Sequence, residues 1–153
     1  MNVGRRVDYA IRALAYLAGQ ESGRLVRRSE IEAQQGIPRH FLSKILRALV
    51  GAGFLESVAG ARGGFRLRRP ANEISFVDVY ECFEGELCLI ECLRDNGSVC
   101  NFTSVCTQID VWRTARQKLF EYLGSVSIAD VADGAGLECR LKRNGSCATE
   151  RPA

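Results

Sequence analysis

The fold is decided by a stretch in the first third of the chain, which reads Pro38-Arg39-His40-Phe41-Leu42-Ser43-Lys44-Ile45-Leu46-Arg47-Ala48-Leu49. Its apolar residues recur at helical spacing and predict the buried stripe of a helix that Pro38 opens: Phe41, Leu42, Ile45, Leu46 and Leu49. The opposite face carries Arg39, His40, Ser43, Lys44 and Arg47. The stretch therefore predicts an amphipathic helix whose outer surface is polar and basic.

Two more helices are predicted ahead of this one. An apolar stripe made of Ala10, Ile11, Leu14, Leu17 and Ala18 indicates a helix over about residues 7 to 18. Ser29 is followed three residues later by Glu32, which is typical of a capping box and predicts a short helix ending at Gly36. Two short helices joined by a glycine-containing turn describe a helix-turn-helix, whose second helix would enter the major groove of DNA.

A β-hairpin is predicted next. Residues 54–58 and the alternating segment 65–68 flank the turn Gly60-Ala61-Arg62-Gly63-Gly64. An arginine among glycines lets the backbone approach a phosphate chain while Arg62 reaches into a minor groove. Gly63, Gly64 and Arg66 are included in this predicted DNA surface. Because helix, turn, helix and wing occur in this order, DNA binding is favoured over an ordinary helical hairpin with an incidental basic strand pair.

Charge is divided between the two halves of the chain. Up to Pro70 there are 13 arginines and lysines against 5 acidic residues, and from Ala71 onward there are 8 against 13. The basic half is therefore expected to face a polyanion. No apolar run approaches membrane-spanning length, and the first residues are short, polar and basic, so we expect a cytoplasmic protein with no membrane partner.

Cysteines supply the second strong signal. The chain has seven, and Cys92, Cys100 and Cys106 are separated by seven and five residues. In a reducing compartment, clustered thiols are metal ligands or redox sensors rather than a disulfide framework. Three soft thiolates suit an iron–sulfur cluster or zinc and need a fourth ligand. Cys88 would make an all-thiolate set within one chain, or it packs as a buried cysteine.

The remaining cysteines carry less information. Cys82 continues the helical pattern of Phe76, Val79 and Phe83, so we expect it in the core. For Cys139 and Cys147 a disulfide, a metal contact and no role all remain open.

From residue 8 to residue 131 the chain resembles the Rrf2 type of bacterial winged-helix regulators, whose cluster-binding branch includes the iron–sulfur cluster regulator IscR, the nitric-oxide sensor NsrR and the rhizobial iron regulator RirA. The resemblance is carried by Asp8-Tyr9-Ala10-Ile11-Arg12-Ala13-Leu14, Phe41-Leu42, Arg62-Gly63-Gly64-Phe65, Ile74-Ser75-Phe76-Val77-Asp78-Val79, the three cysteines, Trp112 and Ser127-Ile128-Ala129-Asp130-Val131. It implies a [4Fe-4S] or [2Fe-2S] cluster. It also implies that Asp8 of the partner subunit is the fourth ligand, as in NsrR-like proteins, with Cys88 as the alternative.

The predicted architecture is mainly α with a small β-hairpin wing. A winged helix-turn-helix occupies residues 1–85, a cysteine loop 86–106, a dimerisation helix and following segment 107–135, and a basic flexible tail 136–153. The dimerisation helix, over about residues 107 to 123, is predicted from the stripe Ile109, Trp112, Ala115, Leu119 and Leu123. The family resemblance favours a homodimer on a palindromic operator. So does symmetry, because a two-fold symmetric dimer presents two equal recognition helices to the two half-sites of a palindrome.

The sequence therefore predicts a dimeric repressor whose affinity for double-stranded DNA depends on an iron–sulfur cluster that senses iron, nitric oxide or redox state. Two alternatives remain open. One is a zinc- or thiol-based regulator with the same DNA-binding half, and the other is an iron–sulfur electron carrier. No phosphate-binding loop, cofactor fingerprint or paired acid and base accompanies the cysteines, so an enzyme is not expected.

Overall fold

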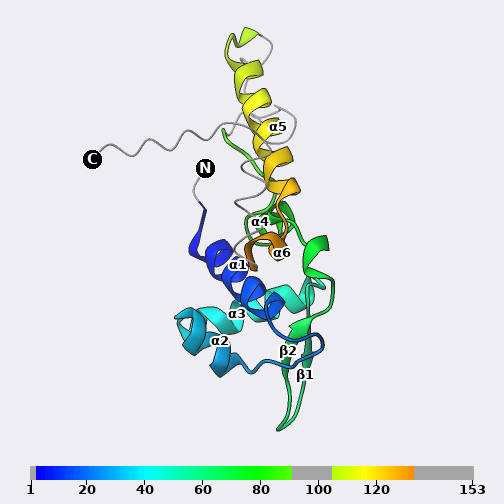
Figure 1. Ribbon diagram of the computed structural model, residues 1–153. Helices are drawn as coiled ribbons and strands as arrows, with labels where there is room; N and C mark the ends of the chain where they lie inside the picture. Colours follow the sequence, from blue (N-terminus) through cyan, green and yellow to red (C-terminus); the bar gives the residue numbers. More distant parts are fainter. Residues whose placement is uncertain (1–2, 91–104, 133–153) are drawn as a thin grey trace, which may run out of the picture.

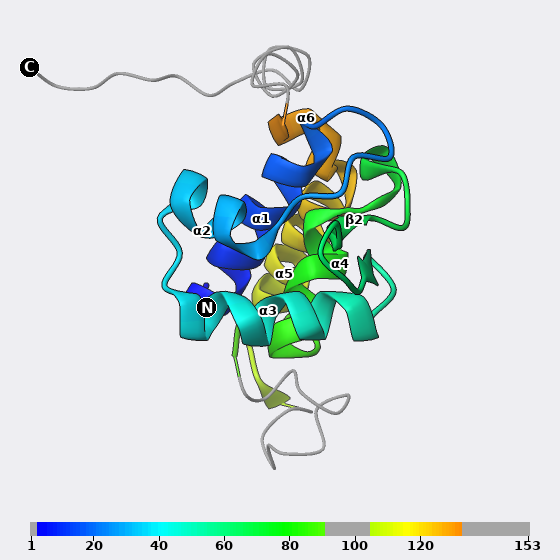
Figure 2. The same ribbon diagram turned by 90° about the horizontal axis from the view of Figure 1, so that it is seen from below.

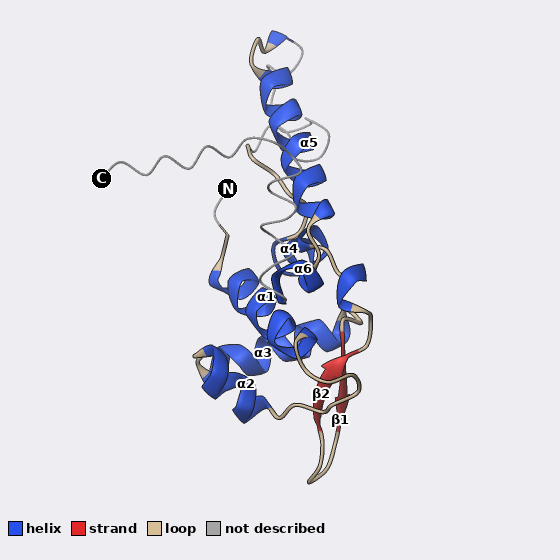
Figure 3. Ribbon diagram, viewed as in Figure 1, coloured by secondary structure: helices blue, strands red, loops and turns tan. Residues whose placement is uncertain are grey.

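The computed structural model describes residues 3–90 and 105–132. Its elements, in chain order, are α1 (Arg5–Ala18), α2 (Arg28–Gln35), α3 (Arg39–Gly51), β1 (Leu55–Val58), β2 (Gly64–Leu67), η1 (Ala71–Glu73), α4 (Phe76–Glu84), α5 (Ile109–Ser125) and α6 (Ile128–Ala132). The described part is mainly helical, and its two strands form one antiparallel hairpin (Figure 3). This confirms the predicted fold class.

The core is built around α1, which contacts α2, α3, α4 and α6. Its residues Ala10, Ala13 and Leu14 are fully buried. They pack into one apolar cluster with the buried face of α3, which consists of Leu42, Ile45, Leu46 and Leu49. Phe41 is only partly buried and packs against the edge of that cluster. The predicted stripe of α3 is thus the stripe that the fold buries.

The helix-turn-helix is formed by α2, the turn at Gly36 and α3. Gly36 ends α2 in the left-handed conformation, with φ of 60°, which favours glycine. Pro38 is the residue immediately before α3 and not its first helical residue. Figure 2 shows α3 crossing the lower edge of this unit, with α1 and α2 above it.

The capping box predicted at Ser29 is wrong. Helix α2 already begins at Arg28, and no side chain caps its first turn. The cause is a long-range contact: Val26 and Phe65 exchange two backbone hydrogen bonds of 2.9 Å, which hold the chain extended up to Val26. The carbonyl of Arg27 then accepts from the amide of Glu30, so the helix starts directly after this bridge.

The wing pairs β1 with β2 in the register Leu55 with Leu67 through Val58 with Gly64. It projects from one end of the molecule, and α5 projects from the other (Figure 1). Helix α5 begins two residues later than predicted and ends at Ser125. No helix in the described segments is long and apolar enough to cross a membrane.

The C-terminal end of α5 is joined to the winged unit where two similar N-terminal helix caps meet, one on α4 and one on α6. The carboxylate of Asp78 accepts from the amide and hydroxyl of Ser75 at the start of α4, and Asp130 does the same for Ser127 at the start of α6. Ser75 and Ser127 face each other in an antiparallel bridge, flanked by a 2.8 Å hydrogen bond from the amide of Ile128 to the carbonyl of Ile74. The chain therefore returns from α5 into the same core, where Ile128 is fully buried.

Candidate DNA-binding surface and cluster ligands

The outer face of α3 is basic and accessible. Arg39, His40, Lys44 and Arg47 are all exposed. Within the described segments none of these four side chains has a carboxylate partner. The ring of His40 lies against that of Phe41, with centroids 4.4 Å apart, which ties its position to the half-buried aromatic beneath it. The structure thus brings together four of the five predicted residues of this helix as an unneutralised basic face.

The fifth, Ser43, already has partners within the protein. Its hydroxyl donates to the carbonyl of Arg39 across 2.9 Å and accepts from Nη1 of Arg28 across 3.2 Å. A hydroxyl has one donor hydrogen, so Ser43 can offer a base only an acceptor lone pair while these bonds hold.

At the tip of the wing, Arg62 is exposed. The tip is braced from the helix-turn-helix, because Nη2 of Arg27 donates to the carbonyl of Ala61 across 3.0 Å. Gly63 and Gly64 have packing roles inside the hairpin. A Cβ on Gly63 would lie 2.1 Å from the carbonyl oxygen of Val58, and one on Gly64 would lie 2.6 Å from that of Val26. Both positions therefore require glycine to build the wing.

Arg66 does not join the other predicted DNA-binding residues. It pairs across the hairpin with Glu56, with Nε 2.9 Å from Oε2. That hydrogen bond lowers the pKa of the Glu56 carboxyl and raises the pKa of Arg66. Its neighbour Phe65 lines the side of the wing that faces α3, whereas Arg66 lines a different recess beside the end of α1.

A groove of about 300 Å³ lies between α3 and the wing. We call it the α3–wing groove, and it is lined by Arg28, Ser43, Leu46, Arg47, Val50, Ser57 and Phe65. Arg28 and Ser57 were not singled out by sequence reasoning. The only available signal was the pair of arginines, Arg27 and Arg28, just before the predicted second helix.

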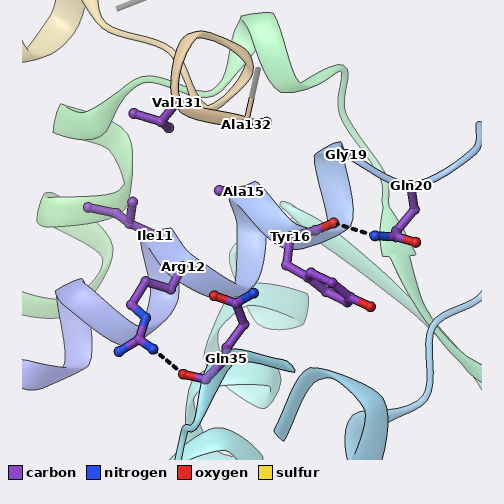
Figure 4. A pocket seen from close by; sticks show the side chains of 9 residues that line it. All are labelled: Ile11, Arg12, Ala15, Tyr16, Gly19, Gln20, Gln35, Val131 and Ala132. Carbon is purple, nitrogen blue, oxygen red and sulfur yellow. Dashed lines mark hydrogen bonds between the residues drawn. The ribbon is translucent and has the colours of Figure 1, made fainter. Parts of the chain in front are cut away.

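Asp8, the predicted ligand from a partner subunit, lies in the first turn of α1 with its side chain 56% exposed. Its one ion pair in the described segments is a loose contact of 3.7 Å with Nη1 of Arg12. The Arg12 guanidinium also donates to the carbonyl of Gln35 and borders an open groove between α1 and α6 (Figure 4). Asp8 is therefore held weakly and is accessible from solvent.

The cysteines are only partly within the described segments. Cys106 is half-buried just before α5, and the thiol of Cys88 donates to the carbonyl of Ile90 across 2.8 Å. Cys92, Cys100, Cys139 and Cys147, and the predicted tail at 136–153, lie outside. Cys82 packs against the core as expected, and burial raises the pKa of its thiol. The described residues alone contain no group of three or more potential metal ligands.

A helix-turn-helix with an exposed basic second helix, followed by a hairpin with an arginine at its tip, defines a winged helix-turn-helix DNA-binding protein. Comparison with known proteins gives the family. The sequence profile described as "Rrf2: Iron-dependent Transcriptional regulator" matches residues 3–134. The chain belongs to the Rrf2 family and is a transcriptional regulator, not an enzyme.

The relatives agree with this assignment. Rv1287 of Mycobacterium tuberculosis, named as an HTH-type transcriptional regulator, is 37% identical over 137 residues, which cover 88% of this chain and 83% of that protein. Among solved structures, CymR, the global cysteine regulator of B. subtilis, has a TM-score of 0.72 at 22% identity, covering 87% of this chain and 97% of that one. IscR of T. potens has a TM-score of 0.65 at 24% identity, covering 99% and 94%. These two likenesses show the shared fold.

Proposed function

We propose that this regulator is a dimeric repressor whose affinity for a palindromic operator is controlled by an iron–sulfur cluster. The observation that carries the proposal is the anchoring of the segment that bears the cysteines. Leu87 before it and Ile109 after it are buried, and Nε of Arg116 on α5 donates to the carbonyl of Leu87 across 2.7 Å. Thiols at positions 92, 100 and 106 therefore belong to one segment whose two ends are both fixed at α5.

The donor set fits a cluster. Three thiolates are soft ligands suited to iron–sulfur clusters, and a carboxylate at the fourth position would be a harder and weaker ligand. Bound there, a cluster would supply a centre that nitric oxide, oxygen or iron loss can alter. Asp8 is suited to be the fourth cluster ligand, because its carboxylate is exposed and makes only a loose ion pair. Cys88 is the alternative, and its thiol is held by a backbone carbonyl.

Dimerisation through α5 is supported by the apolar surface that this helix leaves uncovered. Val111 is 67% exposed, Trp112 38%, Phe120 40% and Tyr122 42%. These side chains are spread over about half of the helix circumference, and the helix points away from the winged unit (Figure 1), so the described residues cover little of this surface. A second copy packed on the same helix by two-fold symmetry would bury the part of this surface that faces it and would place two α3 helices to read two half-sites about one DNA turn apart.

The cluster site would be coupled to DNA binding through the packing of α1 against α3. Asp8 lies on α1, and α1 packs directly against the buried side of α3. A bond from the partner's cysteine segment to Asp8 would tie α1 of one subunit to the other subunit. Breaking that bond would change the separation or mobility of the two α3 helices, and operator affinity would change with it.

The test is anaerobic purification followed by an absorption spectrum and analysis of iron and sulfide. We expect a brown protein, and Cys92→Ala, Cys100→Ala and Cys106→Ala should each lose iron and sulfide. Cys82→Ala, Cys139→Ala and Cys147→Ala are the controls and should retain both. A colourless protein that contains zinc would instead establish the zinc-based regulator, and full iron and sulfide in any of the first three variants would refute the ligand assignment.

A further inference from the structure

We infer that the α3–wing groove binds the sugar–phosphate strand that separates the major groove from the minor groove of the operator. Arg28 is the residue of this groove that binds a phosphate. The inference rests on the DNA-binding part of the proposed function and does not depend on a cluster. It adds Arg28 to the residues that contact DNA. It also places Arg47 beside Arg28 in the same phosphate-binding groove.

Geometry is the first support. A recognition helix lies in the major groove and a wing arginine lies in the adjacent minor groove. The two grooves are divided by one backbone strand, so that strand must pass between the two protein elements. In this protein the space between α3 and the wing is the α3–wing groove, lined by Ser43 and Arg47 from the helix and by Ser57 and Phe65 from the hairpin.

Chemistry is the second support. The groove is lined by two guanidinium groups and by the hydroxyl of Ser57, which can donate to phosphate oxygens, whereas the hydroxyl of Ser43 already donates to Arg39. Its floor includes Leu46, Val50 and Phe65, which suit the apolar edge of a deoxyribose. Within the described segments, no carboxylate neutralises Arg28 or Arg47. The groove is therefore built for an anion with an apolar flank.

The state of Arg28 is the third support. Its Nη1 donates to Ser43, but its Nε is completely shielded from solvent and has no hydrogen-bond partner in the described structure. A guanidinium has five donor hydrogens, and shielding one without a partner is unfavourable. Arginine in the first turn of a helix is also poorly placed relative to the helix dipole. Because Nε itself is closed to solvent, a phosphate bound with the DNA would be held by the Nη groups and would offset both unfavourable features.

The experiment uses the full-length protein and a duplex of 30 base pairs that the protein itself enriches from a random-sequence pool. Arg28→Met removes the guanidinium but keeps an apolar stem. Arg5→Met, at the exposed start of α1 and far from the wing, is the control that removes an equal charge. Fluorescence anisotropy at several salt concentrations gives the affinity and the salt slope, and phosphate ethylation interference maps the contacted phosphates.

We expect Arg28→Met to bind roughly tenfold more weakly, with the slope of log affinity against log salt reduced by about 0.9. One phosphate position, between the major-groove and minor-groove contacts, should disappear from the ethylation pattern. Arg28→Lys should restore part of the affinity, and Arg5→Met should leave the ethylation pattern intact.

Two results would overturn the inference. One is a weaker Arg28→Met variant with an unchanged salt slope and ethylation pattern, because Arg28 would then only brace Ser43. The other is wild-type behaviour in all three measurements. If the wild-type protein enriches no duplex, the DNA-binding part of the proposed function fails together with this inference. Far-UV circular dichroism and thermal melting of each variant identify any loss of affinity that comes from misfolding.

Discussion

Nη1 of Arg28, in the first turn of α2, donates a hydrogen bond of 3.2 Å to Oγ of Ser43 on the exposed face of α3. Ser43, one of the five residues predicted on the DNA-facing side of α3, is therefore held by a cation from the preceding helix. Changes at Ser43 and at its neighbour Lys44 should consequently have different effects.

Lys44→Ala should change which bases are preferred, because Lys44 is exposed and has no carboxylate partner in the described segments. Ser43→Ala should lower affinity for all sequences by a similar factor, because it removes the anchor of Arg28 and leaves an arginine donor unpaired. Selection of binding sites from random DNA by each variant measures this. The same altered preference in both variants would contradict the distinction.

In the wing, Arg62→Ala should weaken DNA binding by roughly tenfold and reduce any preference for A·T-rich flanks, since a narrow minor groove attracts an inserted arginine. Arg66→Ala is the matched control on the same hairpin. Because Arg66 is paired with Glu56 and lines a different recess, its loss should change affinity by less than about twofold. Anisotropy titrations decide the matter, and equal losses would show that the DNA contacts both sides of the wing.

Gly64→Ala should destabilise the fold by about 2 to 4 kcal/mol, because its methyl group would collide with backbone atoms of Val26 that cannot move without breaking the bridge to Phe65. Gly51→Ala is the control. Gly51 is the last residue of α3 and has open space around it, so alanine should be neutral or should stabilise by up to about 1 kcal/mol. Urea unfolding of both variants tests this, and equal stabilities would refute the packing role of Gly64.

Acid should weaken the contact between α1 and α2. Hydrogen bonds from Arg24 and then from Tyr16 lower the pKa of the Glu30 carboxyl below its ordinary value of 4.5. A lowered pKa contributes stability that is present above 4.5 and is lost as the pH falls through the lowered value. Glu30→Gln should therefore flatten the acid side of a plot of unfolding free energy against pH. Glu32→Gln, on the same helix, is the control for the loss of one carboxylate, and a wild-type curve for Glu30→Gln would contradict the prediction.

The fourth cluster ligand can be identified with a pair of variants. If Asp8 of the partner completes the site, Asp8→Ala should still assemble a cluster through the cysteines but should lose it faster to a chelator. Cys88→Ala should then behave as wild type. Anaerobic reconstitution followed by absorbance decay compares them, and the reverse order of decay rates would assign the site to Cys88.

Local patterns predicted the helices well. The buried stripes of α1 and α3 depend on residues within one or two turns, so periodicity was sufficient. The packing roles of Gly63 and Gly64 and the position of Arg28 depend on backbone atoms that are distant in the sequence. A pattern cannot reveal such contacts.

The three possible capping boxes illustrate the same limit. Ser29 precedes Glu32 with the expected spacing, yet the bridge at Val26 moves the helix start upstream and leaves Ser29 inside the first turn. The boxes at Ser75 and Ser127 do form, because these two residues are paired with each other in extended backbone, which is the conformation that a capping residue needs. The same spacing of residue types has opposite outcomes because tertiary contacts fix the backbone first.

The bridge between Ser75 and Ser127 also has a mechanical consequence. Helix α5 has 17 residues and is fastened to the winged unit at its C-terminal end, so it is a rigid arm of roughly 25 Å with a fixed pivot. A displacement of about 2 Å at the far end of such an arm corresponds to a rotation of about 5° at its base. Cys106 lies just before the far end of this arm, so a displacement there would reach the winged unit as a small rotation at the junction where Ser127 pairs with Ser75.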